Sequence, residues 1–295
     1  MSFIRKWSSL LGLGLLCCAI NATAQDKNHL VDVVYGHKLG CALTMDVFKP
    51  EKPNGIGVIW MVSGGWVSNH NNISAPTAKP YTDRGQTVFE VVHGSNPRFT
   101  LPEIVQDINR AVRYIRTHAA EYGVDPDKLA VCGGSAGGHL SLFMAAYGSA
   151  GDPNAKDPVD RASSKVACTA IFYPPTDFLN YGKMGDSAFE IPTLKSYYPV
   201  FAIPAGSTTE DKIKIGKSLS PIYGLSTETG PVLIIHGNAD TLVPIQQSEL
   251  VMAKLEELHV DHKLIVRPGK GHGWAGIEND LPILADWIQD HLGKK

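Results

Sequence analysis

The stretch with the clearest chemical meaning is Gly133-x-Ser135-x-Gly137. Residues 129–132 suit a buried strand, and an apolar helical run follows the turn. A serine on so tight a turn needs small neighbours two residues before and after it. The turn directs backbone N–H groups and a helix N-terminus toward its hydroxyl. A glycine turn also occurs by chance, but the flanking elements and the Gly137-Gly138 pair favour a nucleophilic serine.

A serine hydroxyl becomes a good nucleophile when a base removes its proton and a third group orients that base. Asp240 follows the apolar run 233–235, and His272 follows the last strand-like run, 262–266. Because the carboxyl ends of parallel strands meet at one edge of a sheet, these side chains can approach Ser135 there. The order serine, aspartate, histidine is the one found with such strand–turn–helix serines.

The rest of the chain alternates strand-like and helix-like runs, which indicates an α/β fold with a mostly parallel central sheet and helices on both faces. The hydrophobic periodicity predicts strands at 30–35, 41–48, 57–62, 87–92, 129–132, 166–173, 231–235 and 262–266. It predicts helices at 77–84, 101–122, 245–258 and 281–292, besides the one after Ser135.

Residues 176–217 interrupt this rhythm. They show no clear period and concentrate six aromatic side chains: Phe178, Tyr181, Phe189, Tyr197, Tyr198 and Phe201. The segment is either an irregular packed insertion or a lid that shapes a pocket, and the two interpretations are compatible.

With these motifs the chain resembles the α/β-hydrolases of the carboxylesterase type, close to the hormone-sensitive-lipase-like and acetyl esterase branches. The resemblance covers residues 55–295 and rests on Asp125-Pro126, Gly133-Gly134-Ser135-Ala136-Gly137-Gly138, Asp240-x-x-Val243-Pro244 and Gly271-His272. It implies an α/β-hydrolase fold, with residues 25–295 as a single domain.

By this resemblance Ser135 is the nucleophile, His272 the general base and then acid, and Asp240 the orienting carboxylate. The oxyanion hole would combine the N–H groups of Gly64, Gly65 and Ala136. The family usually has His-Gly-Gly-Gly where this chain has Val62-Ser63-Gly64-Gly65. The hydrogen bonding of that loop is therefore an open question at this point.

Three further side chains are candidates for the substrate pocket. Trp66 follows the oxyanion loop and Trp274 follows His272, and each either walls the pocket or packs behind it. His139 begins the helix after Ser135, where a structural role is favoured over contact with the substrate. His236 ends a strand before Asp240 and is interpreted as a satisfied polar residue near the site.

The first 24 residues have the features of a secretory signal peptide. Arg5 and Lys6 precede an apolar run at 10–20, and Ala22-Thr23-Ala24 offers a cleavage site before Gln25. The run is short for a membrane span, although an uncleaved anchor is the alternative. We therefore expect a secreted or periplasmic protein that has no membrane contact after cleavage.

Composition excludes several other classes. Loss of Arg5 and Lys6 takes the formal net charge from −2 to −4, and no basic block suggests nucleic acid as a partner. Cys41, Cys132 and Cys168 follow the leader, too few for a disulfide framework, and no spacing suggests a metal site. We expect no cofactor and no metal, and the sequence leaves the oligomeric state open.

These observations favour an exported serine esterase that acts through an acyl-enzyme on short (acetyl) or aromatic acyl esters. Compartment and family suggest carbohydrate esters, those of polysaccharides among them, as substrates. Two alternatives are a prolyl-oligopeptidase-like serine peptidase and a hydrolase-like binding protein. The first usually carries a propeller domain and a bulkier residue beside the serine, and the second usually lacks the serine or the histidine.

Overall fold

The computed structural model describes residues 27–293, so the predicted signal peptide lies outside the described residues. An eight-stranded sheet runs through the molecule in the order β1-β2-β4-β3-β5-β6-β7-β8. The strands are β1 (His29–Lys38), β2 (Cys41–Phe48), β3 (Gly55–Met61), β4 (Thr87–Val91), β5 (Val124–Gly134), β6 (Cys168–Phe172), β7 (Val232–Gly237) and β8 (His262–Arg267). The neighbouring pairs from β4 to β8 are parallel, whereas β2 runs antiparallel to β1 and β4.

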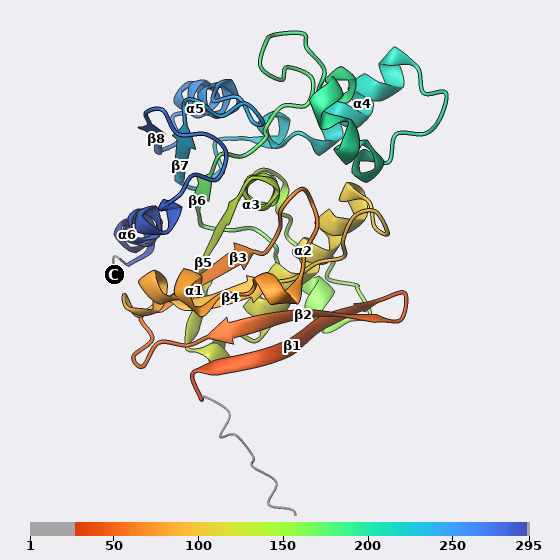
Figure 1. Cartoon of the computed structure of the whole chain (residues 1–295). Coiled ribbons are helices and arrows are strands. Elements are labelled where there is room, and N and C mark those ends of the chain that lie inside the picture. The colour runs from red at the N-terminus through yellow and green to blue at the C-terminus, as the bar shows by residue number, and fades with distance from the viewer. Residues whose placement is uncertain (1–26, 294–295) are drawn as a thin grey trace, which may run out of the picture.

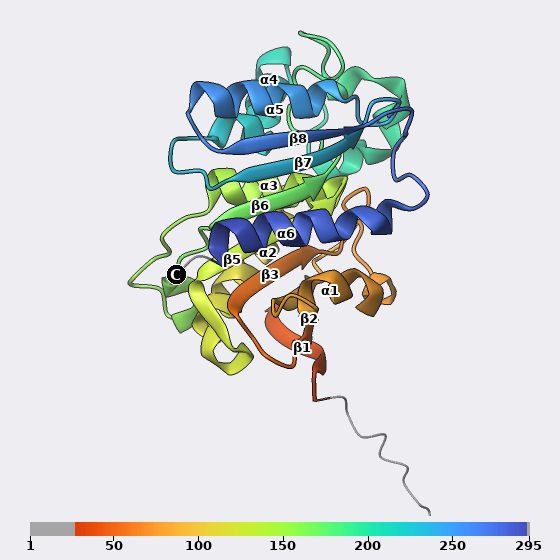
Figure 2. The ribbon, with the colours of Figure 1, turned by 90° about the vertical axis from the view of Figure 1, so that its left-hand side faces the viewer.

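Helices cover both faces of this sheet (Figure 1). They are α1 (Ala75–Thr82), α2 (Leu101–Thr117), α3 (Ala136–Tyr147), α4 (Thr209–Leu219), α5 (Gln246–Glu257) and α6 (Leu281–Leu292). Figure 2 shows α1 and α6 on one side of the sheet, and α2 and α3 on the other. The predicted fold class is confirmed.

Two apolar layers hold the helices to the sheet, because the central parallel strands alternate their side chains between the two faces. Val58 and Ala130 pack with α1 and α6, whereas Ile59 and Val131 pack with α2 and α3. Nearly all of these side chains are fully buried. The layers therefore fix the carboxyl ends of the strands, where the predicted site residues lie.

Most predicted elements appear within a few residues of their expected bounds, and α6 has the predicted ones. The expected helix 101–122 ends at Thr117 and continues as a 3-10 turn, Ala119–Tyr122, before Gly123 in the left-handed region. The sequence predicted no regular element in residues 176–217, but α4 begins at Thr209 within this segment. Its N-terminus has a capping box in which the Thr208 hydroxyl and the Asp211 carboxylate satisfy each other's backbone N–H groups.

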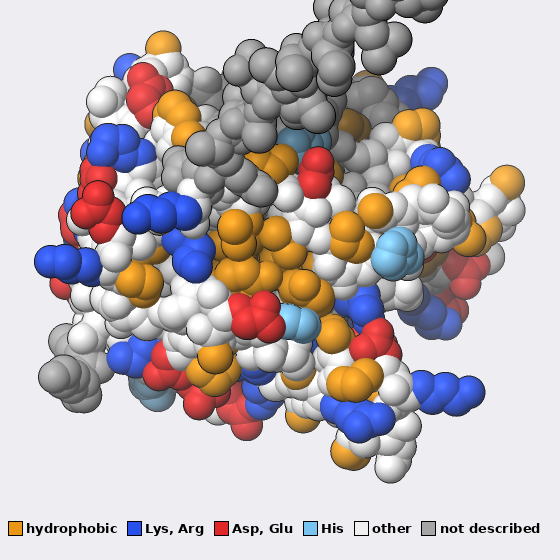
Figure 3. Space-filling model, turned by 90° about the horizontal axis from the view of Figure 1, so that it is seen from below, with side chains coloured by type: hydrophobic (Ala, Val, Ile, Leu, Met, Phe, Trp, Pro, Cys, Tyr) orange, Lys and Arg blue, Asp and Glu red, His pale blue; other side chains and the backbone are white. Residues whose placement is uncertain are grey.

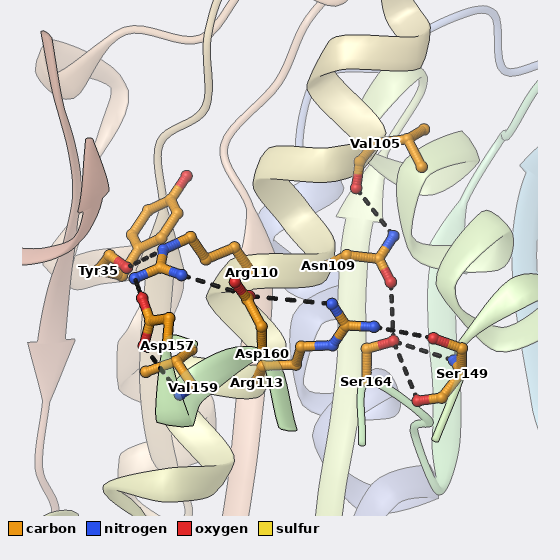
Figure 4. A network of polar contacts seen from close by, with 10 residues as sticks. All are labelled: Tyr35, Val105, Asn109, Arg110, Arg113, Ser149, Asp157, Val159, Asp160 and Ser164. Carbon is orange, nitrogen blue, oxygen red and sulfur yellow. Dashed lines mark hydrogen bonds and ion pairs between the residues drawn. The ribbon is translucent and has the colours of Figure 1, made fainter. Parts of the chain in front are cut away.

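A polar network joins α2 to its surroundings (Figure 4). Arg110 donates to the Tyr35 carbonyl at 3.0 Å and to Asp157 at 2.7 Å, and Ser164 donates to Asn109 at 2.7 Å. These bonds fix α2 against β1 and against the connector between α3 and β6. Arg110 thus ties three elements together.

β1 is an edge strand. Its pairing with β2 is interrupted near Asp32, which has a φ of 55°, and such an irregularity discourages further strand pairing. Val31 and Val34 of β1 and Leu39 in the turn that follows it are exposed. Figure 3, which views the molecule from the side of β1 and β2, shows hydrophobic side chains at the centre of this face. Within residues 27–293 no helix combines the length and apolar character needed to cross a bilayer.

Candidate active site

Ser135 lies at the sharp turn between β5 and α3, with φ 54° and ψ −120°. This conformation is costly for a residue other than glycine and persists only where the surroundings enforce it. A Cβ atom at position 137 would lie 2.6 Å from the Met61 carbonyl oxygen, and one at 133 would lie 2.6 Å from the carbonyl carbon of Gly137. Glycine is therefore required on both sides of the serine for the chain to turn this tightly.

A chain of hydrogen bonds joins the three residues named from the sequence. His272 Nε2 lies 2.9 Å from Ser135 Oγ, and His272 Nδ1 lies 2.7 Å from Asp240 Oδ2. Because a carboxylate only accepts, Nδ1 carries the proton toward Asp240 and Nε2 is free to accept from the serine. The imidazole is thus held in the tautomer that a general base needs.

The Asp240 carboxylate is surrounded by donors. Oδ1 accepts from the N–H groups of Leu242 and Val243, each at 2.9 Å, and Oδ2 faces His236 Nε2 at 3.4 Å besides His272. Burial on its own would raise the pKa of Asp240. The hydrogen bonds from His236, His272 and Val243 outweigh burial and hold this pKa well below its usual range. Asp240 therefore stays ionised at neutral pH.

His236 has a larger part in this arrangement than the sequence suggested. It is fully buried, its Nε2–H donates to the Val243 carbonyl at 2.9 Å, and its Nδ1 accepts from the Ser248 hydroxyl at 2.7 Å. The ring thus fixes the turn 240–243 that carries the carboxylate. Sequence reasoning could have found it from the His236-Gly237 pair four residues before Asp240.

The predicted oxyanion hole needs one correction. The Gly64 N–H donates to the Val67 carbonyl at 3.0 Å, within a tight two-way bridge, and is not available to a substrate. The N–H groups of Gly65 and Ala136 have no acceptor among the described residues and border the same cavity as Ser135. Two donors therefore remain for an oxyanion, in place of the three predicted.

Two serine hydroxyls support this loop, in which position 62 is a valine. Ser68 Oγ donates to the Val62 carbonyl at 2.5 Å, and Ser95 Oγ donates to the Ser68 carbonyl at 2.7 Å. The Ser68 N–H in turn donates to Ser95 Oγ at 2.8 Å. The question of the missing histidine is thereby answered: two hydroxyls from neighbouring loops hold the turn.

A small cavity of about 30 Å³, here called the serine cavity, adjoins Ser135. Its lining is largely apolar, and five of its side chains come from the 176–217 segment. It consists of Gly65, Trp66, Ser135, Ala136, Pro175, Phe178, Tyr181, Leu194, Tyr197, Phe201, Leu242 and Val243. The segment is therefore a packed insertion that also shapes the pocket.

The insertion is anchored on α5. The Gln247 side chain accepts from the N–H groups of Thr176 and Asp177, each at 2.8 Å, and donates to the Asn180 carbonyl at 2.8 Å. Tyr181 Oη donates to the Leu242 carbonyl at 2.9 Å, beside the turn that carries Asp240. The pocket wall and the catalytic turn are thus tied together.

Of the predicted pocket residues, Trp66 lines the serine cavity, but His139 does not. His139 is fully buried behind Trp66, accepts from Trp66 Nε1 at 3.3 Å, and donates to the Leu219 carbonyl at 2.8 Å. Burial lowers the pKa of His139 to about 4. His139 thus has the structural role that the sequence favoured, and it is not the possible pocket residue that was also considered, because the insertion packs over it. Trp274 is buried against Phe172 and Tyr173, behind the catalytic histidine.

One group of side chains in the described part of the chain is close enough to hold a metal ion. Ligand atoms of Asp32, Asp46 and His70 all lie within 4.8 Å of one another. His70 pairs with both carboxylates at 3.2 and 3.3 Å, and His29 Nε2 donates to Asp46 at 2.7 Å. None of these residues borders the serine cavity, and their mutual bonds account for the arrangement without an ion.

Comparison with known proteins identifies the family. The BD-FAE family model matches residues 45–255, a range that includes Ser135 and Asp240 and ends before His272. The probable carboxylic ester hydrolase LipM of Mycobacterium tuberculosis is 28% identical over 241 residues, which cover 79% of this chain and 53% of LipM. The chain spans about half the length of such curated relatives.

Solved structures share the fold. A truncated carbohydrate esterase from gut microbiota superimposes with a TM-score of 0.76 at 24% identity, covering 90% of this chain and 96% of that one. An acetyl ester-xyloside bifunctional hydrolase from Caldicellulosiruptor lactoaceticus gives 0.69 at 21% identity, with 88% and 92% covered. Because the family model spans well over half of the sequence, this chain belongs to the BD-FAE family, and its fold is that of the α/β-hydrolases of the carboxylesterase type.

Proposed function

We propose that this protein is a serine esterase that cleaves esters of short carboxylic acids through an acyl-enzyme. One observation carries the proposal. The hydrogen-bonded chain Asp240–His272–Ser135 ends beside two unpaired N–H groups, at the wall of an apolar cavity. A nucleophile, its base and an anion-stabilising pair at one point are what acyl transfer requires.

Acylation follows from this geometry. His272 Nε2 takes the Ser135 proton as Oγ bonds to the ester carbonyl carbon, and the carbonyl oxygen becomes an anion that accepts from Gly65 and Ala136. Asp240 stabilises the imidazolium that forms. When the tetrahedral intermediate collapses, the bond from carbon to the alcohol oxygen breaks, and that oxygen receives the proton from Nε2.

Deacylation repeats these steps with water. His272 takes a proton from the water as its oxygen attacks the acyl carbon, and the same two N–H groups hold the second oxyanion. Collapse breaks the bond to Ser135 Oγ, which recovers its proton from Nε2. The acid leaves and the enzyme is restored.

The acyl group is best accounted for as acetyl. A cavity of about 30 Å³ beside Ser135 suits a short acyl group better than an aromatic one. The short-chain arm of the sequence-based hypothesis therefore has the stronger support.

Polysaccharide esters are the substrates we favour. Two structural relatives are described as a carbohydrate esterase and an acetyl ester-xyloside hydrolase. We also propose export, on the basic residues, apolar run and Ala22-Thr23-Ala24 site at the start of the sequence. N-terminal sequencing of the protein recovered from outside the cytoplasm should then begin at Gln25.

Hydrolysis of p-nitrophenyl esters from acetate to octanoate, by the protein and its Ser135→Ala variant, tests the activity. We expect the highest kcat/KM with acetate, and a loss of about 10⁴-fold or more in the variant. A fluorophosphonate probe should label the parent protein and not the variant. Turnover of a dipeptidyl amide without ester turnover would favour the peptidase alternative, and an intact fold without labelling would favour a binding protein.

A further inference from the structure

A second cavity lies at the same edge of the sheet as the serine cavity. Its volume is about 170 Å³, and it lies between β3, α1, the end of β6 and the 3-10 helix Ile277–Asp280. Its lining includes Trp60, Thr77, Gly134, Tyr173 and Glu278. Nothing in the catalytic steps described above uses these side chains, although Gly134 directly precedes the nucleophile.

The position of this cavity matches the path of the leaving alcohol. The alcohol oxygen must take a proton from His272 Nε2, so the alcohol half of the ester lies on the histidine side of Ser135. The Tyr173 ring packs against the His272 ring at 4.6 Å between centroids, and the same tyrosine lines the second cavity. The serine cavity instead includes Gly65 and Ala136, the donors of the proposed oxyanion hole. We therefore assign it to the acyl half of the ester.

Its lining combines apolar surface with a few polar groups. Trp60, Phe172 and Tyr173 supply aromatic surface, and Ile277 and Leu281 add aliphatic surface. Four polar groups at this lining have no hydrogen-bond partner within residues 27–293. They are the Trp60 indole N–H, the Thr77 hydroxyl, the Tyr173 hydroxyl and the carboxylate of Glu278, which is exposed. Aromatic faces combined with a few unpaired donors and acceptors suit a ring that is apolar on its faces and bears hydroxyl groups at its edge.

We propose that the second cavity binds the alcohol half of the ester and that this alcohol is a single sugar ring. The proposal rests on the esterase function proposed above and adds to it the residues that select the alcohol. The aromatic side chains pack against the ring, while Thr77 and Glu278 bond to its hydroxyl groups. A simple alkyl alcohol leaves these polar groups unpaired, and the cavity then discriminates against it.

Three acetates test this inference in the full chain: a mono-O-acetylated methyl xyloside, cyclohexyl acetate and ethyl acetate. Cyclohexyl acetate has a six-membered ring without the hydroxyl groups. We expect kcat/KM to be at least tenfold higher for the sugar acetate than for cyclohexyl acetate. In a Thr77→Val/Glu278→Gln double variant this ratio should fall at least tenfold.

Thr82→Val in the same helix and Glu121→Gln on the surface are matched controls, and neither should change the ratio. Thermal unfolding checks that all variants fold. A ratio in the double variant within twofold of the parent, with ethyl acetate still hydrolysed, overturns the sugar site and leaves the esterase function standing. Hydrolysis of none of the three acetates by the parent protein overturns both.

Discussion

The serine cavity, which Ser135 lines, and the second cavity, which Gly134 borders, differ in how they can select a substrate. The serine cavity is small and largely apolar, and under the proposed function it selects an acyl group by size. The second cavity is larger and has unpaired polar groups, so it can select an alcohol by hydrogen bonds. Selection by size in an apolar pocket is worth only about 10- to 200-fold per methylene, whereas unpaired polar groups can reject a wrong ligand more strongly.

The two cavities also come from different parts of the chain. The 176–217 insertion, anchored on Gln247, supplies five of the twelve residues that line the serine cavity, whereas α1 and the segment that leads into α6 supply four of the eight that line the second. Both cavities lie at the sheet edge where the chain Asp240–His272–Ser135 is placed. A change in the insertion should therefore alter acyl preference, and a change in α1 should alter alcohol preference, each without disturbing the other.

The largest effect should come from the part that both cavities share. Asp240→Asn removes the charge that stabilises the His272 imidazolium and allows the wrong tautomer, so kcat should fall about 10⁴-fold for every ester. Initial rates with p-nitrophenyl acetate and with the sugar acetate should fall by the same factor. Asp83→Asn, at a surface ion pair with Lys79, is the control. A loss below tenfold would contradict the role assigned to Asp240.

A smaller effect should appear on the acyl side alone. Leu194→Ala enlarges the serine cavity, and the ratio of kcat/KM for p-nitrophenyl butyrate to that for acetate should rise about 10- to 100-fold. The preference between sugar and cyclohexyl acetates should stay as in the parent. Leu179→Ala, in the same insertion but outside the cavity lining, controls for general loosening. An unchanged chain-length profile would show that Leu194 does not limit the acyl group.

The sequence predicted the residues whose positions follow from nearby strands. It did not predict those whose contacts depend on distant residues or on unusual backbone conformations. Ser135, Asp240 and His272 could be named because each follows a recognisable strand, and parallel strands end at one edge. Gly64 could not be excluded from the oxyanion hole, since its bond to Val67 depends on the left-handed conformations of Gly65 and Trp66. The burial of His139 depends on Leu219, eighty residues away, which local patterns do not reveal.

The smallest expected effect is on the pH dependence of stability, which should differ between a group near the second cavity and a group behind the serine cavity. Glu90 pairs in register with Trp60 of the second cavity, and burial raises its pKa from 4.5 to about 8, aided by nearby Asp46 and opposed by the Ser74 N–H. Behind the serine cavity, burial lowers the pKa of His139 from 6.5 to about 4. Each group therefore changes its proton affinity on folding, but in opposite directions.

Between pH 4.5 and 8 the folded protein retains the Glu90 proton that the unfolded chain loses, so this group makes stability fall as pH rises. Between pH 4 and 6.5 His139 is protonated in the unfolded chain but neutral in the folded protein. This group therefore makes the free energy of unfolding rise with pH. Each contributes at most about 1.4 kcal/mol per pH unit. Urea unfolding from pH 5 to 9 should show Glu90→Gln losing less stability than the parent above pH 6.5, with Glu121→Gln as control. Parallel curves for Glu90→Gln and the parent would mean that Glu90 is ionised in the folded protein, and that the second-cavity side of the sheet is more polar than its packing indicates.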